Sequence, residues 1–292
     1  MEETNSTFVI PHLNNPGVLR CIETLYKHTE NFRLIVIDQS NGQTNFDSVK
    51  DKIHLYIKSY RNLGFAKAAN LGIQLADTKF VTILNDDVEF INKRWWPAIE
   101  DVFEKFPDAL AVNPASMRRL NGVGTPTDYG VVEPTDVTKF PYQESYTDEE
   151  YQLMIDECSR VGEEIRPNGI HIDGITPWCV TFYREELLKC GLFDETFFPG
   201  GGEDYDFMNR CYLHWKRGDC KRGRWIGTSL SVAWHWWLTT KKSLDISTNF
   251  LDASALYKKK WSTPEFENPY PMGNQSKKLE ELEMKEYVIE PL

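Results

Sequence analysis

An apolar run that stops at two adjacent aspartates constrains this chain most. Residues 80–84 read Phe-Val-Thr-Ile-Leu and are followed directly by Asn85, Asp86 and Asp87. A short run rich in β-branched residues predicts a strand that is buried on both faces of a mostly parallel sheet. Open α/β sheets bind ligands beyond the carboxyl ends of their strands, and paired carboxylates at such an end can hold a divalent cation. A plain acidic turn after a strand is the competing interpretation.

Size and charge restrict the class of protein. The chain has 292 residues, 41% of them hydrophobic, and a formal net charge of -11. This size suffices for one large α/β domain or for a domain with an appendage. The acidic balance argues against a nucleic-acid-binding protein, because such proteins neutralise phosphates with basic side chains. Six cysteines without a C-x-x-C pair predict free thiols in a cytosolic setting.

No targeting pattern is evident in the sequence. The first six residues are polar and acidic, which does not predict a secretory signal. No apolar run reaches the roughly 20 residues that a membrane-spanning helix needs. We therefore expect a cytoplasmic protein, either free or peripheral to a membrane, and the sequence leaves its oligomeric state open.

Strands and amphipathic helices alternate over the first 90 residues. The predicted strands lie at 7–10, 34–37, 53–57 and 80–84, and the predicted helices at 18–26 and 61–76. This alternation predicts an α/β fold with a Rossmann-like, mostly parallel central sheet flanked by helices. Asn15 is expected to cap the first helix and Pro16 to stand in its first turn.

The second half of the chain is predicted to hold further elements around a long irregular segment. Helices are expected at 95–106, 148–165, 184–190 and 203–215, and extended segments at 109–112, 172–183 and 229–237. Thr147 and Glu150 form a capping-box sequence at the second of these helices. Residues 113–147 are expected to pass over the ligand edge of the sheet. The tail after residue 262 is expected to be a peripheral helix or partly disordered.

Two further polar elements stand in the second half. Glu203 and Asp204 follow the segment 199–202, Pro-Gly-Gly-Gly, whose glycines let the backbone turn tightly and leave room for a substrate. Asp204 lies at a predicted helix start, where the helix dipole favours a negative charge. His235 lies within a cluster of tryptophans. Taken singly, the first element is ordinary helix N-terminal chemistry and the second is a packing histidine.

In this order, the motifs resemble those of the inverting GT-A glycosyltransferases of the family-2 type (rhamnosyl-, galactosyl- and glucosyltransferases). The resemblance covers about residues 6–240 and rests on Asn14, Asp38, the Asn-Leu-Gly-Phe-Ala-Lys-Ala-Ala-Asn-Leu-Gly segment at 62–72, Asn85-Asp86-Asp87, the segment 184–198, Glu203-Asp204-Tyr205-Asp206 with Arg210, and Val232-Ala233-Trp234-His235. It implies a GT-A fold with an acceptor-side subregion. Residues 1–112 would be the nucleotide-sugar-binding half, 113–245 the acceptor-binding and catalytic half, and 246–292 a C-terminal helical or irregular extension.

The resemblance implies a donor site at the ends of the early strands. Asp38 would hydrogen-bond the base of the nucleotide, and Asp86 would contact the ribose or the metal. The other donor-binding residues that it implies are Pro11, Asn14, Asn62, Gly64, Lys67 and Asn85. Lys67 is equally well interpreted as a solvated helix lysine, and Lys241 and Lys242 as a solvated basic turn or as partners of the diphosphate.

Asp87 and His235 are the metal ligands that the resemblance implies. A carboxylate–imidazole pair suits Mn²⁺ better than Mg²⁺, which is the alternative ion. Asp204 would be the general base that deprotonates the acceptor hydroxyl in a single, inverting displacement. Glu203 would orient the loop or an acceptor hydroxyl, and Asp206 would cap the helix or bind Arg210.

The acceptor side is expected to comprise Gly201, Gly202 and an aromatic platform, Trp178 or Trp236, with core packing as the alternative for either ring. Asn85 stands where many relatives have aspartate, which leaves the donor open. A UDP-sugar is favoured over dTDP-rhamnose or a GDP-sugar. The acceptor would be a glycan or glycoconjugate.

The predicted function is metal-dependent sugar transfer from a nucleotide-sugar to a hydroxyl group. A nucleotide-sugar- or glycan-binding module without turnover is the main alternative. The turn after the first strand, residues 11–17, lacks G-x-G-x-x-G and so argues against a dehydrogenase. It also lacks the glycine-rich, basic phosphate loop of a nucleotidyltransferase.

Overall fold

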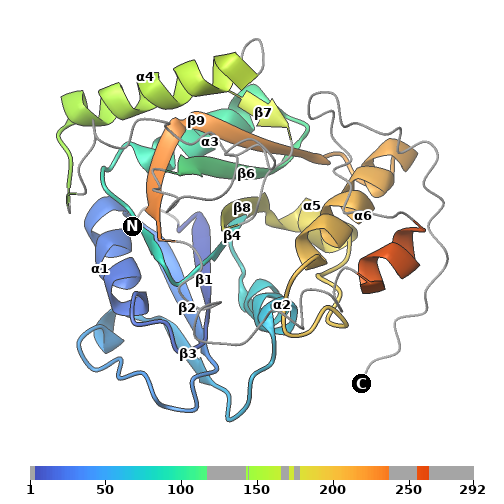
Figure 1. Ribbon diagram of the computed structural model, residues 1–292, viewed down its shortest axis with the longest axis horizontal. Coiled ribbons are helices and arrows are strands. Elements are labelled where there is room, and N and C mark those ends of the chain that lie inside the picture. Colours follow the sequence, from blue (N-terminus) through green and yellow to red (C-terminus); the bar gives the residue numbers. More distant parts are fainter. Residues whose placement is uncertain are drawn as a thin grey trace.

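The structure is a computed structural model that describes residues 4–116, 143, 145–165, 171–173, 178–236 and 255–262. Figure 1 shows a twisted central sheet with helices on both of its faces. The strands are β1 (Ser6–His12), β2 (Phe32–Asp38), β3 (Leu55–Lys58), β4 (Phe80–Leu84), β5 (Val88–Glu89), β6 (Ala109–Ser116), β7 (His171–Asp173), β8 (Cys179–Tyr183) and β9 (Arg224–His235).

The sheet is mostly parallel, as predicted. Its strand order is β3-β2-β1-β4-β8-β6-β9-β5, and β7 pairs with β9. β1 runs parallel to both β2 and β4, whereas β8 is antiparallel to its neighbours β4 and β6. All five residues of β4 are buried, as its β-branched sequence predicted. Strands from both sequence halves therefore form one sheet, and the functional division at residue 112 stays a prediction.

Strand ends differ from the predictions where pairing overrides local sequence. β6 continues to Ser116 through Pro114, which lies at a register shift against β9. Such an irregularity accommodates a proline that lacks an N–H. β9 begins at Arg224, five residues before the predicted start, because β6 and β7 pair with its first half. The extended segment expected at 172–183 is described as two strands, β7 and β8.

The helices are α1 (Val18–His28), α2 (Phe65–Leu75), α3 (Trp95–Lys105), α4 (Asp148–Ile165), α5 (Arg184–Lys189) and α6 (Glu203–Arg217), with a 3-10 turn at Lys50–Lys52 and a short helix at 255–261. The capping box at α4 is confirmed by reciprocal hydrogen bonds between Thr147 and Glu150 at 2.9 and 3.2 Å. Gly17 is the N-cap of α1, two residues later than a cap at Asn15 predicts. Asn15 Oδ1 nevertheless accepts a hydrogen bond from the Gly17 N–H at 2.9 Å, as a capping asparagine does.

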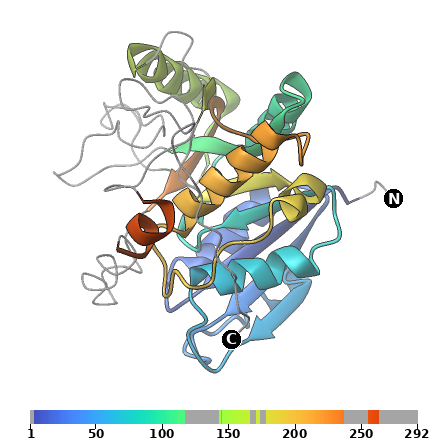
Figure 2. The same ribbon diagram turned by 90° about the vertical axis from the view of Figure 1, so that its right-hand side faces the viewer.

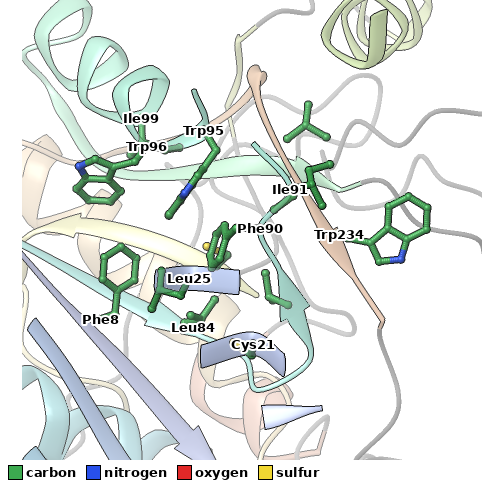
Figure 3. Close-up of a cluster of buried hydrophobic side chains, with 14 of the residues drawn as sticks. Phe8, Cys21, Leu25, Leu84, Phe90, Ile91, Trp95, Trp96, Ile99 and Trp234 are labelled. Atoms are coloured by element: carbon green, nitrogen blue, oxygen red, sulfur yellow. The ribbon is translucent and has the colours of Figure 1, made fainter. Parts of the chain in front are cut away.

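Two helical layers cover the sheet. On β1, Phe8 and Ile10 point into a core shared with α1, α3 and α4, and Val9 points into a core shared with α2, α5 and α6. Figure 2 shows α2, α5 and α6 on the same side of the sheet. The first core supports the turn after β4, since Phe90 stacks on Trp95 with ring centroids 4.0 Å apart (Figure 3).

The helix at 255–261 was not predicted from the sequence. Its Tyr257 and Trp261 are fully buried and pack with Phe197 beside α6 (Figure 2). All six cysteines are buried free thiols, as predicted. None of the helices that the structure describes is both long and apolar enough to cross a membrane.

Candidate active site

The carboxyl end of β4 places two aspartates in a buried turn. Asp86 and Asp87 are each 6% exposed, and Asn85 is half-buried. Asp86 accepts a hydrogen bond from Asn15 Nδ2 at 2.9 Å, and His12 Nδ1 lies 2.8 Å from its other oxygen. Burial raises the pKa of Asp86, against the His12 and Asn15 hydrogen bonds that favour the charged form. The turn is therefore a buried polar site, in which Asp86 contacts Asn15 and His12, and not a solvated acidic turn.

His12 is a site residue that sequence reasoning missed. It ends β1, is fully buried, and its Nε2 lies 2.7 Å from Thr44 Oγ1. The available signal was its position: β1 and β4 were both predicted strands of one parallel sheet, so their carboxyl ends meet at one edge. His12 thereby connects the turn after β4 to the loop after β2.

The second candidate metal ligand reaches Asp87 from the far end of the chain. His235 Nε2 lies 3.3 Å from Asp87 Oδ1. Backbone pairing fixes this approach, because Val88 pairs with His235 and the Trp236 N–H donates to the Asp87 carbonyl at 3.0 Å. His235 is 4% exposed, and its Nε2 has no hydrogen-bond partner among the described residues. A buried imidazole nitrogen that faces a carboxylate without hydrogen-bonding is suited to ligate a cation.

Trp178 and Trp236 flank this pair in different ways. Trp178 stacks on His235, with ring centroids 4.8 Å apart and an angle of 11° between the rings. This stacking holds the imidazole in place. Because Trp178 is only 2% exposed, it presents no open ring face for the predicted acceptor platform. Trp236 is 42% exposed, and its Nε1 donates to Glu89 at 3.0 Å.

Among the residues that the structure describes, no third acidic or imidazole ligand joins the pair. Within the described ranges, no group of three or more His, Cys, Asp or Glu side chains could hold a metal ion. Asp87 and His235 would therefore need other oxygens to complete a coordination sphere.

The end of β2 carries Asp38, which is fully buried. Its oxygens accept hydrogen bonds from the Ser40 N–H at 2.8 Å and from the Tyr56 hydroxyl. Burial alone would raise the pKa of Asp38, but the Ser40 and Tyr56 hydrogen bonds lower it below its ordinary value. The carboxylate is therefore held ionised. Sequence reasoning missed Tyr56, whose exposed position on the edge strand β3 gave no signal.

Other predicted donor residues surround this edge. Pro11 is half-buried in β1, next to His12. Asn14 is exposed and has a φ of 55°, in the left-handed region that asparagine tolerates.

The segment 62–72 holds a loop of the second half against α2. Asn62 Oδ1 accepts a hydrogen bond from the Gly64 N–H at 2.8 Å, and the Phe65 N–H donates to the Pro199 carbonyl at 2.9 Å. Gly64 has a φ of +80°, and a Cβ there would lie 2.9 Å from Phe198. The left-handed φ at Gly64 is also why α2 begins at Phe65 and not at residue 61 as predicted.

The second asparagine of the segment reaches the same loop. Asn70 Nδ2 donates to the Phe193 carbonyl at 2.8 Å, and Asn70 Oδ1 accepts from the Phe193 N–H at 2.9 Å. Lys67 pairs with Glu195 at 3.3 Å, with both side chains 42% exposed. Asn70 and Lys67 thus contact this loop, and the donor-binding roles predicted for Asn62, Gly64 and Lys67 stay predictions.

The loop delivers Glu203 and Asp204 to the start of α6. Gly200, Gly201 and Gly202 have φ values of 156°, 115° and 87°, which only glycine adopts readily. Glu203 is 7% exposed, and its carboxylate accepts a hydrogen bond from the Gly201 N–H; its role in orienting the loop stays a prediction. Asp204 is half-buried in the first turn of α6, where the helix dipole favours its charge.

Asp206 is fully buried and binds Arg210 at 2.9 Å, which confirms one of its two predicted roles. Several predictions lie outside the described residues. They concern Lys241, Lys242, most of the segment 113–147 and the tail after residue 262.

Comparisons with known proteins agree with this architecture. Residues 7–147 match the family model described as Glycosyl transferase family 2. TarS from S. aureus superposes with a TM-score of 0.52 and 15% identity over 88% of this chain and 39% of that structure. Its 1–349 form gives a TM-score of 0.51 and 16% identity over 87% of this chain and 64% of that structure. No curated protein matches the sequence.

The chain spans less than two thirds of either TarS structure, and the low identity supports the fold alone. Together with the family match, it confirms the resemblance to family-2 GT-A glycosyltransferases. The chain therefore has the GT-A fold.

Proposed function

We propose that the chain is a metal-dependent, inverting glycosyltransferase that moves a sugar from a nucleotide-sugar to a hydroxyl of a glycan or other acceptor. The observation that carries the proposal is the buried pair His235 and Asp87, 3.3 Å apart at the carboxyl end of β4. In open α/β sheets this edge is the ligand edge. The family match over residues 7–147 supports a glycosyltransferase at this site.

The two side chains fit Mn²⁺ better than Mg²⁺, because imidazole is a poor magnesium ligand. Ligation would give His235 Nε2 the polar partner that it lacks among the described residues. When bound, the ion would supply a Lewis acid that neutralises charge on the leaving nucleoside diphosphate. Asp86 fits a contact to the ribose or to the outer shell of the metal, because both of its oxygens already face His12 and Asn15.

Asp38 would recognise the base of the donor. Its ionised carboxylate at the end of β2 can accept a hydrogen bond from a ring N–H, as a uracil or thymine base offers. Pro11 and Asn14 would line the same pocket. A UDP-sugar is our preferred donor, with dTDP-rhamnose and GDP-sugars as alternatives.

Asp204 would act as the general base. Its carboxylate would take the proton of the acceptor hydroxyl as that oxygen attacks the anomeric carbon from the face opposite the diphosphate, which inverts the configuration. Such assistance typically contributes ~10²–10⁴-fold to the rate. Glu203 would keep the glycine loop in place, and Trp236, with its partly exposed ring, would stack on an acceptor sugar.

A thermal-shift panel of nucleotide-sugars, each with and without Mn²⁺, tests the donor site. A ligand at 100 times its Kd should stabilise the protein by about 2.7 kcal/mol. We expect metal-dependent stabilisation by one nucleotide class in the wild type. The shift should be lost in Asp87→Asn and retained in Asp51→Asn, a matched change at an exposed position. A panel in which no nucleotide-sugar stabilises the wild type would contradict the proposal.

Asp204→Asn separates catalysis from binding. We expect sugar transfer to fall by ~10²–10⁴-fold while metal-dependent donor binding stays within about twofold of wild type. Transfer near the wild-type rate would remove Asp204 as the base. Donor binding without transfer by the wild type, across a panel of glycan acceptors, would favour a binding module.

A further inference from the structure

A buried lysine connects the C-terminal helix at 255–261 to the catalytic loop. Lys260 is 5% exposed, and its Nζ lies 2.7 Å from Asp194 Oδ2 and 2.8 Å from Asp206 Oδ1. A buried ammonium group is strongly destabilising unless carboxylates pair with it. The position of Lys260 therefore depends on its contacts with Asp194 and Asp206. The role proposed for the active site does not account for Lys260.

The two carboxylates that Lys260 joins stand at the two ends of the loop that carries Asp204. Asp194 lies before the loop, where the N–H and Oγ1 of Thr196 donate to its other oxygen at 3.0 and 2.6 Å. Asp206 lies after it in the first turn of α6, where Arg210 and Trp261 also donate to it at 2.9 Å each. The Lys260 ammonium group thus joins the two ends of the loop directly, beside Arg210, which binds Asp206 and donates to the Leu192 carbonyl at 2.7 Å.

The loop between these ends depends on such restraint. Its three successive glycines have positive φ values, and glycine restricts its own backbone less than any other residue. The charges at its ends balance, because Lys260 and Arg210 face Asp194 and Asp206. Removal of the lysine would leave two buried carboxylates close together with one cation.

We propose that Lys260 is a positioning residue for the transfer reaction: it holds both ends of the segment 194–206 and so fixes Asp204 against the donor site. This inference rests on the proposed function, in which Asp204 is the base. A displacement of about 1 Å at a reacting group can reduce a rate ~10²-fold. The helix at 255–261 is therefore part of the catalytic architecture although it follows the motifs that define the site.

The test compares Lys260→Met with Lys259→Met, an exposed lysine of the same helix. Hydrogen–deuterium exchange of the segment 194–206 reports the restraint without turnover. We expect faster exchange there in Lys260→Met only. We also expect kcat to fall about 10–100-fold, with the Kd for donor and Mn²⁺ within about twofold of wild type. A general loss of folding would reduce kcat and donor binding together.

A double variant keeps the test decisive if Lys260→Met folds poorly. Lys260→Met with Asp194→Asn removes one positive and one negative charge and so restores the charge balance. It does not restore the link between the two ends of the loop, because methionine and asparagine cannot form an ion pair. We expect its Tm to recover toward wild type while kcat stays low. Recovery of kcat along with Tm would overturn the positioning role, as would unchanged kcat and exchange in Lys260→Met.

The outcomes also separate this inference from the proposed function. If the wild type transfers sugar and Lys260→Met transfers it equally well, the positioning role fails and the function stands. If the wild type transfers no sugar from any donor, the function fails and the catalytic role of Lys260 fails with it. The exchange measurement then decides by itself whether Lys260 restrains the loop.

Discussion

Gly64→Ala tests whether the start of α2 supports the loop that precedes Asp204. An alanine there would adopt a φ of +80° with a ψ of 164°, a backbone region that is essentially restricted to glycine and costs another residue about 1–3 kcal/mol. Its Cβ would lie 2.9 Å from Cδ2 of Phe198 and 3.2 Å from the carbonyl oxygen of Pro199. Overpacking typically costs about 1–3 kcal/mol. We take the lower end of the overpacking cost, about 1 kcal/mol, since Phe198 is 56% exposed and can move aside, and expect a total loss of about 2–4 kcal/mol.

Gly218→Ala is a control for a positive φ without crowding, although Gly218 has a ψ of 12° and lies in the left-handed helical region, whereas Gly64 does not. Gly218 has a φ of +81°, and a Cβ there meets no atom within 4 Å. Its expected loss is about 1–2 kcal/mol, all from the left-handed backbone. The difference between the two variants, about 1–2 kcal/mol, then contains the crowding against the loop and the less favourable ψ of Gly64. Urea unfolding gives both free energies, provided that the m-values agree.

The two variants should also differ in turnover. In Gly64→Ala the Cβ pushes on Phe198 and Pro199, so the glycine loop and Asp204 shift, and we expect kcat to fall at least ~10-fold. In Gly218→Ala, at the far end of α6, kcat should equal that of the wild type. Addition of Phe198→Ala to Gly64→Ala should recover part of the lost stability. Equal unfolding free energies and equal kcat values for the two glycine variants would refute the reasoning.

Three further predictions concern the site. His235→Gln should weaken Mn²⁺ binding by at least ~10-fold in isothermal titration without lowering the Tm of the metal-free protein by more than a few degrees; equal affinity would exclude His235 as a ligand. Asn70→Ala should destabilise the protein by about 1–3 kcal/mol, since it leaves the Phe193 amide and carbonyl without their partners, whereas Gln74→Ala, exposed on the same helix, should be near neutral in urea unfolding. Tyr56→Phe should destabilise the protein by about 1.5–3 kcal/mol at pH 7, where Asp38 is charged. Folding lowers the pKa of Asp38, so the ionised carboxylate contributes fully to the free energy of unfolding above its ordinary pKa, and this contribution is lost as the pH falls through the folded value. The difference in unfolding free energy between Tyr56→Phe and wild type should therefore shrink below about pH 4. A difference that stays constant with pH would contradict the assignment.

The sheet was predictable because its signals are local. β4 is a run of apolar and β-branched residues, and burial on both faces follows from that composition. The capping box at α4 is likewise written within four residues, Thr147 to Glu150. The acidic turn after β4 could be placed at the ligand edge, because strand direction in a parallel sheet determines that edge.

The polar contacts that shape the site were not predictable, because each joins distant segments. His12 and Asp86 are 74 residues apart, and Tyr56 reaches Asp38 only through the register in which Val36 faces Tyr56. Asn15 carried a local signal for a helix cap, and its Oδ1 accepts from the Gly17 N–H, but its Nδ2 also donates to Asp86, 71 residues away. The local signal could not reveal this second contact.

The separate roles of α2 and the helix at 255–261 explain why so much of the chain bears on Asp204. From one side, Asn70 and Gly64 fix the segment that leads into the glycine loop. From the other, Lys260 joins Asp194 to Asp206 across that loop. Because the loop is rich in glycine, its position depends on these contacts and not on its own backbone. The geometry of the proposed base should therefore respond to changes in either helix. Asp87 and His235, which the pairing of β5 with β9 brings together, should stay in place.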